Sequence, residues 1–278
     1  MWGTRVHTAA AHSQIFAANR ASGRIALKVA ASGGETRRVR VQEDGALRVR
    51  FPNVADRSLE AVIVNTGGGI AGGDRFSIEL DAAAGACLLA GTAAAEKVYR
   101  SAGADAEMRV SLTVADGARL AWLPQETILF NRARLSRHIS LDLAESASLI
   151  AAEAVVFGRT AMGEAMQHGC WRDQWRLRRG GRLVFAENVR LDGAIAEKLQ
   201  ARVVAAGAIA LATMIIVPAS DEVLAAVRAL NFRSEAGISA WQGIAVARLI
   251  AADALALRRD LAAMLAVLGN PVPQLWLH

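Results

Sequence analysis

Apolar and polar residues alternate with a period of two along most of the chain. The alternation is clearest at 38–42 (RVRVQ), 76–80 (FSIEL) and 138–143 (HISLDL). A period of two places successive side chains on opposite faces of a β-strand. The pattern therefore predicts a succession of strands from about residue 23 to about residue 217, with little helical periodicity between them.

Turn signals divide some of these strands into hairpins. The turn Arg179-Gly-Gly lies between WRLR at 175–178 and RLVF at 182–185. A second turn, Gln242-Gly243, lies between ISAW at 238–241 and IAVARLI at 244–250. Glycine in a short connection between two alternating runs is typical of a β-hairpin.

The C-terminal part contains two segments with helical spacing. Residues 220–230 open with Ser220 as a candidate N-cap and carry acidic residues in the first turn. Residues 255–268 keep the same spacing and end at Gly269, with Pro271 beyond. No linker rich in Pro, Gly or Ser divides the chain, so we expect a single domain over residues 1–278.

A short pattern, in which a turn residue precedes Ala and then Leu, recurs along the β-rich part. Its copies are DGAL at 44–47, AGACL at 84–88, DGARL at 116–120 and ESASL at 145–149. The last three begin 32 and 29 residues apart. Repeated strand and turn units indicate stacked coils of chain. We therefore predict a mainly β fold, with layered or helically wound β-sheets and two α-helices in the C-terminal half.

Composition limits the classes of partner. The formal net charge is +6, and arginine supplies most of the positive charge, since lysine occurs only at positions 28, 97 and 198. The arginines are scattered, which favours solvated surface or pairing with carboxylates. A basic nucleic-acid-binding β protein stays open as an alternative, because aromatic residues such as Trp122 and Trp171 lie near arginines in the sequence.

Cysteine use and hydropathy favour a cytoplasmic protein. Cys87 and Cys170 stand far apart, which argues against a disulfide framework or a zinc site. The N-terminus lacks the uninterrupted apolar run of a signal peptide. The uncharged segment 203–220 approaches the length of a membrane span, but Gly207 and Pro218 interrupt it, so buried strand is the better interpretation.

Five glycines between 67 and 73 form the most unusual stretch of the sequence. Gly67, Gly69 and Gly72 match the spacing of a dinucleotide-binding loop, and a nucleotide-dependent oxidoreductase using the Gly67–Gly73 loop is a second alternative. Such a site needs a helix after the glycines, whereas residues 74–80 continue as strand. A phosphate-binding loop of the P-loop type also fails, because Asp74-Arg75 stand where Lys and Ser or Thr are required. We favour a flat glycine turn on which another backbone lies.

Six segments follow one another in a definite order, and the first contains the glycine stretch. They are VNTGGGIAGGD at 64–74, TAAAEKVYRS at 92–101, WLPQETILF at 122–130, EAVVFGRTAMGE at 153–164, RLDG at 190–193 and PQLW at 273–276. Together they resemble the signature segments of the UreD family of urease accessory proteins, called UreH in some systems. The sequence departs from that signature at Asn65-Thr66, where the family has prolines, and at 93–96, where it has a stretch containing Pro or Gly. The PQLW end also lacks the usual arginine.

The resemblance implies a urease maturation factor, not an enzyme. Proteins of this family join UreF, and through it the GTPase UreG, on urease apoprotein and promote nickel incorporation into the urease active site. The implied protein is a cytoplasmic chaperone or scaffold with no tightly bound cofactor, only transient contact with nickel, and no nucleic-acid or membrane partner. The resemblance also leaves room for a dimer within that complex.

The resemblance further implies which residues carry the function. The partner-binding and turn positions are Gly68, Gly69, Gly72, Gly73, Asp74, Lys97, Tyr99, Gln125, Gly158, Arg159 and Gly163. The carboxylates that match the family motifs, and would be weak nickel ligands along a transfer path, are Asp74, Glu126, Glu153 and Glu164.

Each of these carboxylates also has a structural interpretation. Asp74 can cap the glycine turn, and Glu126 can anchor the turn that follows Pro124. For Glu153, which lies in an apolar run, an ion pair with Arg159 or Lys97 is favoured over a nickel role. The five histidines, at 7, 12, 138, 168 and 278, show no ligand spacing, so a tight nickel site made by the protein alone is not expected.

Overall fold

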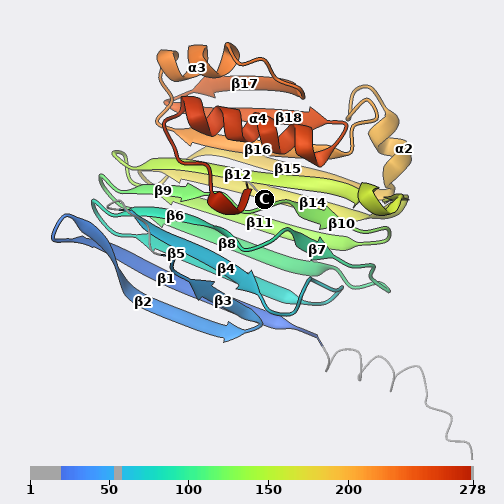
Figure 1. Ribbon diagram of the computed structural model, residues 1–278, viewed down its shortest axis with the longest axis horizontal. Helices are drawn as coiled ribbons and strands as arrows, with labels where there is room; N and C mark the ends of the chain where they lie inside the picture. Colours follow the sequence, from blue (N-terminus) through green and yellow to red (C-terminus); the bar gives the residue numbers. More distant parts are fainter. Residues whose placement is uncertain (1–19, 53–57, 277–278) are drawn as a thin grey trace, which may run out of the picture.

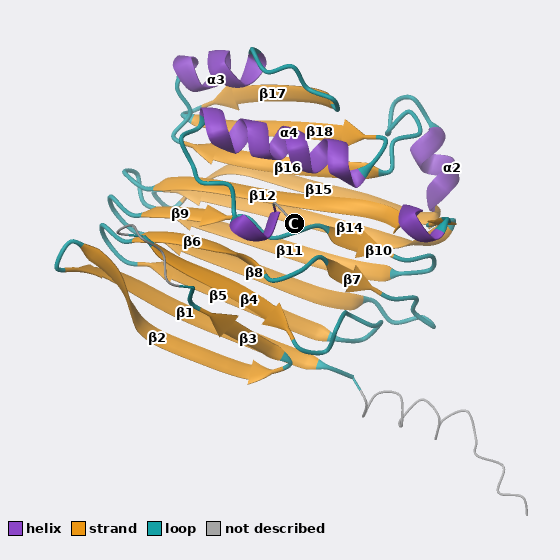
Figure 2. Ribbon diagram, viewed as in Figure 1, coloured by secondary structure: helices purple, strands orange, loops and turns teal. Residues whose placement is uncertain are grey.

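Two β-sheets face one another, with helices outside the larger sheet (Figures 1 and 2). The computed structural model describes residues 20–52 and 58–276, so the N-terminal segment, His7, His12 and His278 lie outside the described residues. The seven-stranded sheet has the order β15 (Arg182–Ala194), β14 (His168–Arg179), β11 (Arg134–Leu143), β8 (Ala106–Val114), β5 (Arg75–Ala82), β1 (Ser22–Ser32) and β2 (Glu35–Gly45).

The second sheet has eleven strands. Its main path runs β17 (Glu235–Trp241), β18 (Ile244–Ala251), β16 (Ala210–Val217), β12 (Ser148–Arg159), β9 (Arg119–Trp122), β6 (Cys87–Thr92), β4 (Leu59–Asn65) and β3 (Leu47–Arg50). Three short strands pair beside it: β7 (Glu96–Val98), β10 (Thr127–Leu129) and β13 (Glu164–Ala165).

The chain winds from one sheet to the other and back. The strands β4, β6, β9 and β12 are parallel neighbours in the larger sheet, while β5, β8, β11 and β14 are parallel neighbours in the smaller one. In sequence these strands alternate between the two sheets. The winding therefore confirms the predicted layered, helical path of a mainly β chain.

The recurring turn pattern is the point at which each coil changes sheet. Ala86, Ala118 and Ala147 are buried, and each donates its backbone N–H to the carbonyl three residues earlier. The following leucines stack in register, since Leu120 pairs with Leu88 of β6 on one side and with Leu149 of β12 on the other. The last three copies of the repeat are thus successive coils. The first copy leads into β3, which is antiparallel to β4 and lies outside this stack.

The helices α3 (Asp221–Arg228) and α4 (Ala254–Val267) cover the outer face of the larger sheet, whereas α2 (Ile195–Gln200) packs against β14 and β15 of the smaller sheet. The helices α3 and α4 were expected, and the side chains of Ser220 and Asp253 accept hydrogen bonds from the backbone N–H groups of Val223 and Ala256 as N-caps. The helix α2, which the sequence did not predict, begins at Ala194 without a side-chain cap. Two short 3₁₀ turns, η1 (Thr160–Met162) and η2 (Gln274–Trp276), complete the helical segments of the described chain.

Two apolar cores follow from this arrangement. The larger lies between the sheets and contains Ile25, Ile78 and Leu112. The smaller lies between the eleven-stranded sheet and α4 and contains Met214, Leu249 and Leu261. The uncharged segment at 203–220 was expected to form two buried strands or one long one, but only β16 is strand, and Val203 is 96% exposed in the turn before it. No helix in the described part of the chain combines the length and apolar character of a membrane span.

The two ends of the winding differ in a way that matters for function. Tight turns at 83–86, 115–118 and 144–147 close one end, which we call the turn end. Longer segments at 66–74, 99–105, 123–133 and 160–167 connect the strands at the other end, which we call the loop end and which lies on the right of Figure 1. Most of the residues that carry the sequence resemblance lie at or beside the loop end.

The stacked leucine row should be a determinant of stability. Leu120 is 3% exposed between Leu88 and Leu149, so Leu120→Ala leaves a cavity flanked by two fixed coils. We expect a loss of about 2–5 kcal/mol in the free energy of unfolding, measured by urea titration. Leu255→Ala is the control, since Leu255 is 55% exposed, and an equal loss in the two variants would contradict the stacked-coil account.

Candidate functional site

The glycine loop at 66–74 lies flat against β7. The backbone N–H of Ile70 donates to the carbonyl of Lys97 at 2.7 Å, and the N–H of Tyr99 donates to the carbonyl of Ile70 at 2.8 Å. The N–H of Gly73 donates to the carbonyl of Asp105 at 3.1 Å. These bonds join the loop to the next coil as though it were a short strand.

Glycine is required at two of these positions because of close approach. A Cβ atom on Gly72 would lie 1.9 Å from the Ser101 hydroxyl oxygen and 2.6 Å from the Ala104 carbonyl oxygen. A Cβ atom on Gly69 would lie 2.4 Å from the Tyr99 ring and 2.8 Å from the Lys97 carbonyl oxygen. Both contacts are far inside van der Waals distance, so the glycines let another segment lie on the loop, as expected.

Asp74 closes the loop as a turn cap. Its side chain is buried and accepts hydrogen bonds from the backbone N–H groups of Ala71 at 2.7 Å and Ala21 at 2.9 Å. The strand β5 begins at Arg75, so the glycines are followed by strand, not by a helix N-terminus. This geometry argues against the oxidoreductase alternative, because the loop lacks the helical amides that hold a pyrophosphate.

Side chains from three coils form one continuous contact beside the loop. The Tyr99 hydroxyl donates to the Gly68 carbonyl at 2.9 Å, and the Tyr99 ring meets Phe130 edge-on at 5.1 Å between centroids. The Arg159 guanidinium lies over the Phe130 ring at 4.2 Å and pairs with Glu164. An aromatic and cationic surface of this kind is typical of protein interfaces.

The glycines at 158 and 163 shape the same region. Gly158 has φ +102°, and a Cβ there would lie 2.4 Å from the carbonyl oxygen of Glu164. Gly163 ends the 3₁₀ turn η1 in the left-handed region, with φ +67°. Together they turn the chain sharply enough for Glu164 to reach back to Arg159 and to accept from the backbone N–H of Asn131 at 3.3 Å.

Glu126 and Gln125 tie the loop end to the C-terminal helix and to the neighbouring coil. The Glu126 carboxylate pairs with Arg258 of α4 through two contacts of 2.8 and 2.7 Å. The Gln125 side chain donates to the carbonyl of Ala93 at 3.0 Å, and its backbone N–H donates to the Thr92 hydroxyl at 2.9 Å. Both residues anchor the segment after Pro124, and Glu126 does so through a partner 132 positions away.

The predicted partners of Glu153 were wrong. Glu153 pairs with Arg137 of β11, whereas Arg159 pairs with Glu164. Arg137 also binds Asp173 of β14 through two contacts of 2.8 and 2.9 Å. Indole N–H groups complete the cluster, since Trp122 donates to Glu153 at 2.8 Å and Trp175 donates to Asp173 at 3.1 Å.

The Arg137 cluster is fully enclosed between the sheets. Arg137 is 1% exposed, while Glu153 and Asp173 are each 4% exposed. Burial raises the pKa of the Glu153 carboxyl, and the attraction of Arg137 opposes this. Burial lowers the pKa of Arg137, but its two carboxylate partners more than offset that effect, so the guanidinium stays charged. The sequence contained a signal for the burial of Arg137. Side chains alternate between the two faces of β11, and Arg137 shares the inward face with Leu135 and Ile139.

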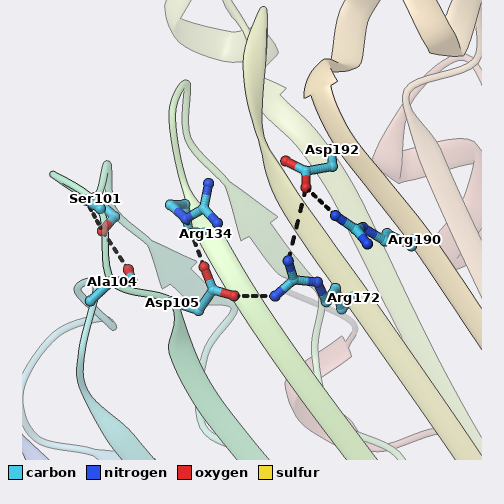
Figure 3. A network of polar contacts seen from close by, with 8 residues as sticks. Ser101, Ala104, Asp105, Arg134, Arg172, Arg190 and Asp192 are labelled. Carbon is cyan, nitrogen blue, oxygen red and sulfur yellow. Dashed lines mark hydrogen bonds and ion pairs between the residues drawn. The ribbon is translucent and has the colours of Figure 1, made fainter.

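A second polar network lies on the outer face of the smaller sheet (Figure 3). Asp105 joins Arg134 of β11 to Arg172 of β14, and Asp192 of β15 joins Arg172 to Arg190. A hydrogen bond and attraction from Arg190 hold the pKa of Asp192 below its usual value. Sequence reasoning assigned no role to this network, because its members are separated by up to 87 positions (105 to 192) and only Arg190 and Asp192 lie in a quoted segment, RLDG at 190–193.

Glu96 and Asn65 form a polar contact next to the glycine loop that the motifs did not assign. The Asn65 side-chain nitrogen donates to both Glu96 oxygens, at 3.0 and 3.2 Å. Burial raises the pKa of Glu96 to about 7, against the opposing effect of the hydrogen bond from Asn65. Glu96 is therefore a carboxyl that titrates near neutral pH at the loop end.

The four candidate nickel ligands do not come together. Asp74, Glu126, Glu153 and Glu164 each have a different protein partner, as given above. Among residues 20–52 and 58–276, no three His, Cys, Asp or Glu side chains gather in the way a metal ion would need. Trp122, Phe157, Trp171 and Trp175 are buried as well, so they belong to the core and not to an exposed stacking surface for nucleic acid.

The fold and the site define a helically wound β protein whose longer loops form one ordered, partly aromatic and cationic end. Comparison with known proteins identifies the family. The model of the UreD urease accessory protein family matches residues 21–276, and the chain belongs to that family.

Relatives resemble the chain over nearly its whole length. It is 54% identical over 280 residues to urease accessory protein UreD 3 of Bradyrhizobium sp. (strain BTAi1 / ATCC BAA-1182), covering 99% of this chain and 100% of that protein. It is 56% identical over 266 residues to urease accessory protein UreD of Rhodopseudomonas palustris (strain BisB18), covering 95% and 96%. The resemblance inferred from the ordered segments is thus confirmed.

Breaking the buried cluster should destabilise the protein strongly. In Arg137→Met, Glu153 and Asp173 lose their common cation while staying buried, so we expect a loss of about 3–5 kcal/mol in the free energy of unfolding at pH 7. Arg24→Met is the matched control, because the exposed Arg24–Glu79 pair should contribute less than about 1 kcal/mol. Urea titration of both variants measures the difference, and equal losses would contradict the account.

Glu96 should make stability depend on pH. Its pKa is raised in the folded state, so unfolding releases a proton between about pH 4.5 and pH 7 and stability falls as pH rises through that window. The free energy of unfolding of the original chain should fall between pH 5 and pH 8, whereas that of Glu96→Gln should not fall for this reason. Relative to the original chain, Glu96→Gln should therefore gain about 2 kcal/mol between the two pH values. Urea titrations at both pH values measure this, and a difference that does not change with pH would rule out the raised pKa.

Proposed function

We propose that this chain is a non-catalytic maturation factor that, with UreF and the GTPase UreG, promotes nickel incorporation into the urease active site. The observation that carries the proposal is the UreD family match over residues 21–276. Relatives that align over 95% or more of this chain are named urease accessory proteins. A role as a scaffold in the cytoplasm, without nucleic-acid or membrane partners, belongs to the same proposal.

The loop end is the surface that we assign to partner contacts. Its exposed side chains combine cationic Lys97 with apolar groups, since Tyr99 is 37% exposed and Met162 is 74% exposed. Mixed surfaces of aromatic, methionine and cationic side chains are enriched at protein interfaces. The bound partners in this proposal are UreF and urease apoprotein, with UreG joining through UreF.

Nickel is cargo in this proposal and makes only transient contacts. Asp74, Glu126, Glu153 and Glu164 remain the proposed ligands, and carboxylate oxygens are weaker ligands for nickel than imidazole or thiolate. Glu164 is the most accessible of the three that form ion pairs, with 26% of its side chain exposed, against 7% for Glu126 and 4% for Glu153. Each contact would exchange with a protein partner already present, which favours release over tight binding.

Deletion of the chain from its host tests the function directly. We expect urease from the deletion strain to have background activity and to lack nickel, measured by a urease assay and by metal analysis of the purified enzyme. Restoring the original chain should restore both. Urease that carries its normal nickel content in the deletion strain would overturn the proposal.

The glycine loop gives this experiment a matched pair of variants. A Cβ on Gly72 collides with Ser101 and Ala104, whereas a Cβ on Gly237 has no atom within 4 Å, and neither glycine requires a positive φ. We expect Gly237→Ala to restore urease activity and Gly72→Ala to restore at most about a tenth of it, because the loop can no longer lie on the segment at 101–104. Circular dichroism checks that both variants fold, and full restoration by Gly72→Ala would remove the loop from the partner surface.

A further inference from the structure

A cavity of about 130 Å³ lies behind the glycine loop, where the two sheets meet the loop end. Its floor is apolar and includes Ile63, Phe76 and Met108. Its polar wall contains Asn65 and Glu96, together with the backbone of the loop at 68–70. The loop therefore borders this partly open cavity, and the two polar side chains lie where the loop and the cavity meet.

Asn65 holds the glycine loop through its side chain. The Asn65 carbonyl oxygen accepts from the backbone N–H of Gly67 at 2.9 Å. The Asn65 amide nitrogen donates to the carbonyl of Gly69 at 3.1 Å and to Glu96 at 3.0 Å. One side chain thus fixes both sides of the first loop turn and links that turn to β7.

Glu96 supplies the other half of the contact. It starts β7, and its backbone N–H donates to the carbonyl of Glu126 at 2.9 Å, so the carboxylate projects from a strand that is fixed to the next coil. The Asn65 nitrogen lies within hydrogen-bond distance of both carboxylate oxygens. Glu96 is therefore a rigid anchor, and Asn65 is the group that couples the anchor to the loop.

We infer that Asn65 and Glu96 form a clamp that holds the glycine loop against the cavity, and that they are positioning residues for the partner-binding surface. The second part rests on the proposed function, since it assumes that the loop end binds UreF and urease. The first part concerns the isolated protein alone. The two parts can therefore fail separately.

Hydrogen exchange of the loop amides tests the clamp. After correction for the intrinsic exchange rate, protection of the Gly67 amide at pH 7 should be close to that of the original chain in Glu96→Gln, which keeps an oxygen acceptor for the Asn65 amide. Asn65→Ala should lower that protection about tenfold at pH 7, because one hydrogen bond to the amide is lost. Asn188→Ala, which removes a side-chain contact with Arg176 in the smaller sheet, is the control and should leave the loop unchanged.

Swapping the amide of Asn65 and the carboxylate of Glu96 between the two positions distinguishes the clamp from a general loss of packing. Asn65→Asp alone places a carboxylate opposite Glu96 and should lower the protection of the Gly67 amide at pH 8. The double variant Asn65→Asp/Glu96→Gln restores an amide opposite a carboxylate and should recover most of that protection. No recovery in the double variant, or protection in Asn65→Ala equal to that of the original chain, would overturn the clamp.

Binding of purified UreF tests the second part. Asn65→Ala should weaken UreF binding about tenfold at pH 7, and the double variant should recover it. If the exchange results hold but UreF binds all variants equally, the clamp stands and its positioning role is wrong. If UreF fails to bind even the original chain, the failure lies with the proposed function.

Discussion

Every other feature of this molecule depends on the register with which one coil of chain stacks on the next. The register is visible in the row of Leu88, Leu120 and Leu149, each buried between the sheets and each aligned with its neighbour. Since side chains alternate along a strand, a shift of one residue would turn this row outward. Short turns with a buried alanine fix the register at one end, and the connections at the other end are free to differ in length and sequence.

Much of this architecture could be predicted because it is local in the sequence. The turn, alanine and leucine pattern gave three successive coils, and the caps at Ser220 and Asp253 begin the two longer helices. The helix α2 escaped prediction because it has six residues and no side-chain cap, so it depends on the burial of Ile195 and Leu199. The partner of Glu153 escaped for a different reason, since Arg159 and Lys97 were plausible by chemistry, and only the facing of β12 in one sheet and β11 in the other brings Arg137 to Glu153.

The site shows the same division between local and long-range information. The glycine spacing predicts a turn on which another segment lies, and the strand that follows Asp74 argues against a dinucleotide loop. The contacts that order the loop, however, come from β7, 31 positions further along the chain. Asn65 and Glu96 lie in two of the quoted segments, but the sequence assigned no role to either side chain, and only their contact in space shows that Asn65 links the glycine loop to Glu96.

Under the proposed function, the ion pairs of the candidate carboxylates favour transient contact with a cation over storage. A storage site needs several ligands aimed at one empty position, whereas Glu153, Glu126 and Glu164 are each already neutralised by a different arginine. A cation could replace an arginine only at the cost of leaving a guanidinium without its partner, and that cost is largest for Arg137 because it is buried. The Arg159–Glu164 pair has the lowest such cost, since its arginine is 40% exposed and water can solvate it. Among these three proposed ligands, Glu164 is therefore the one from which the protein partner is most easily displaced.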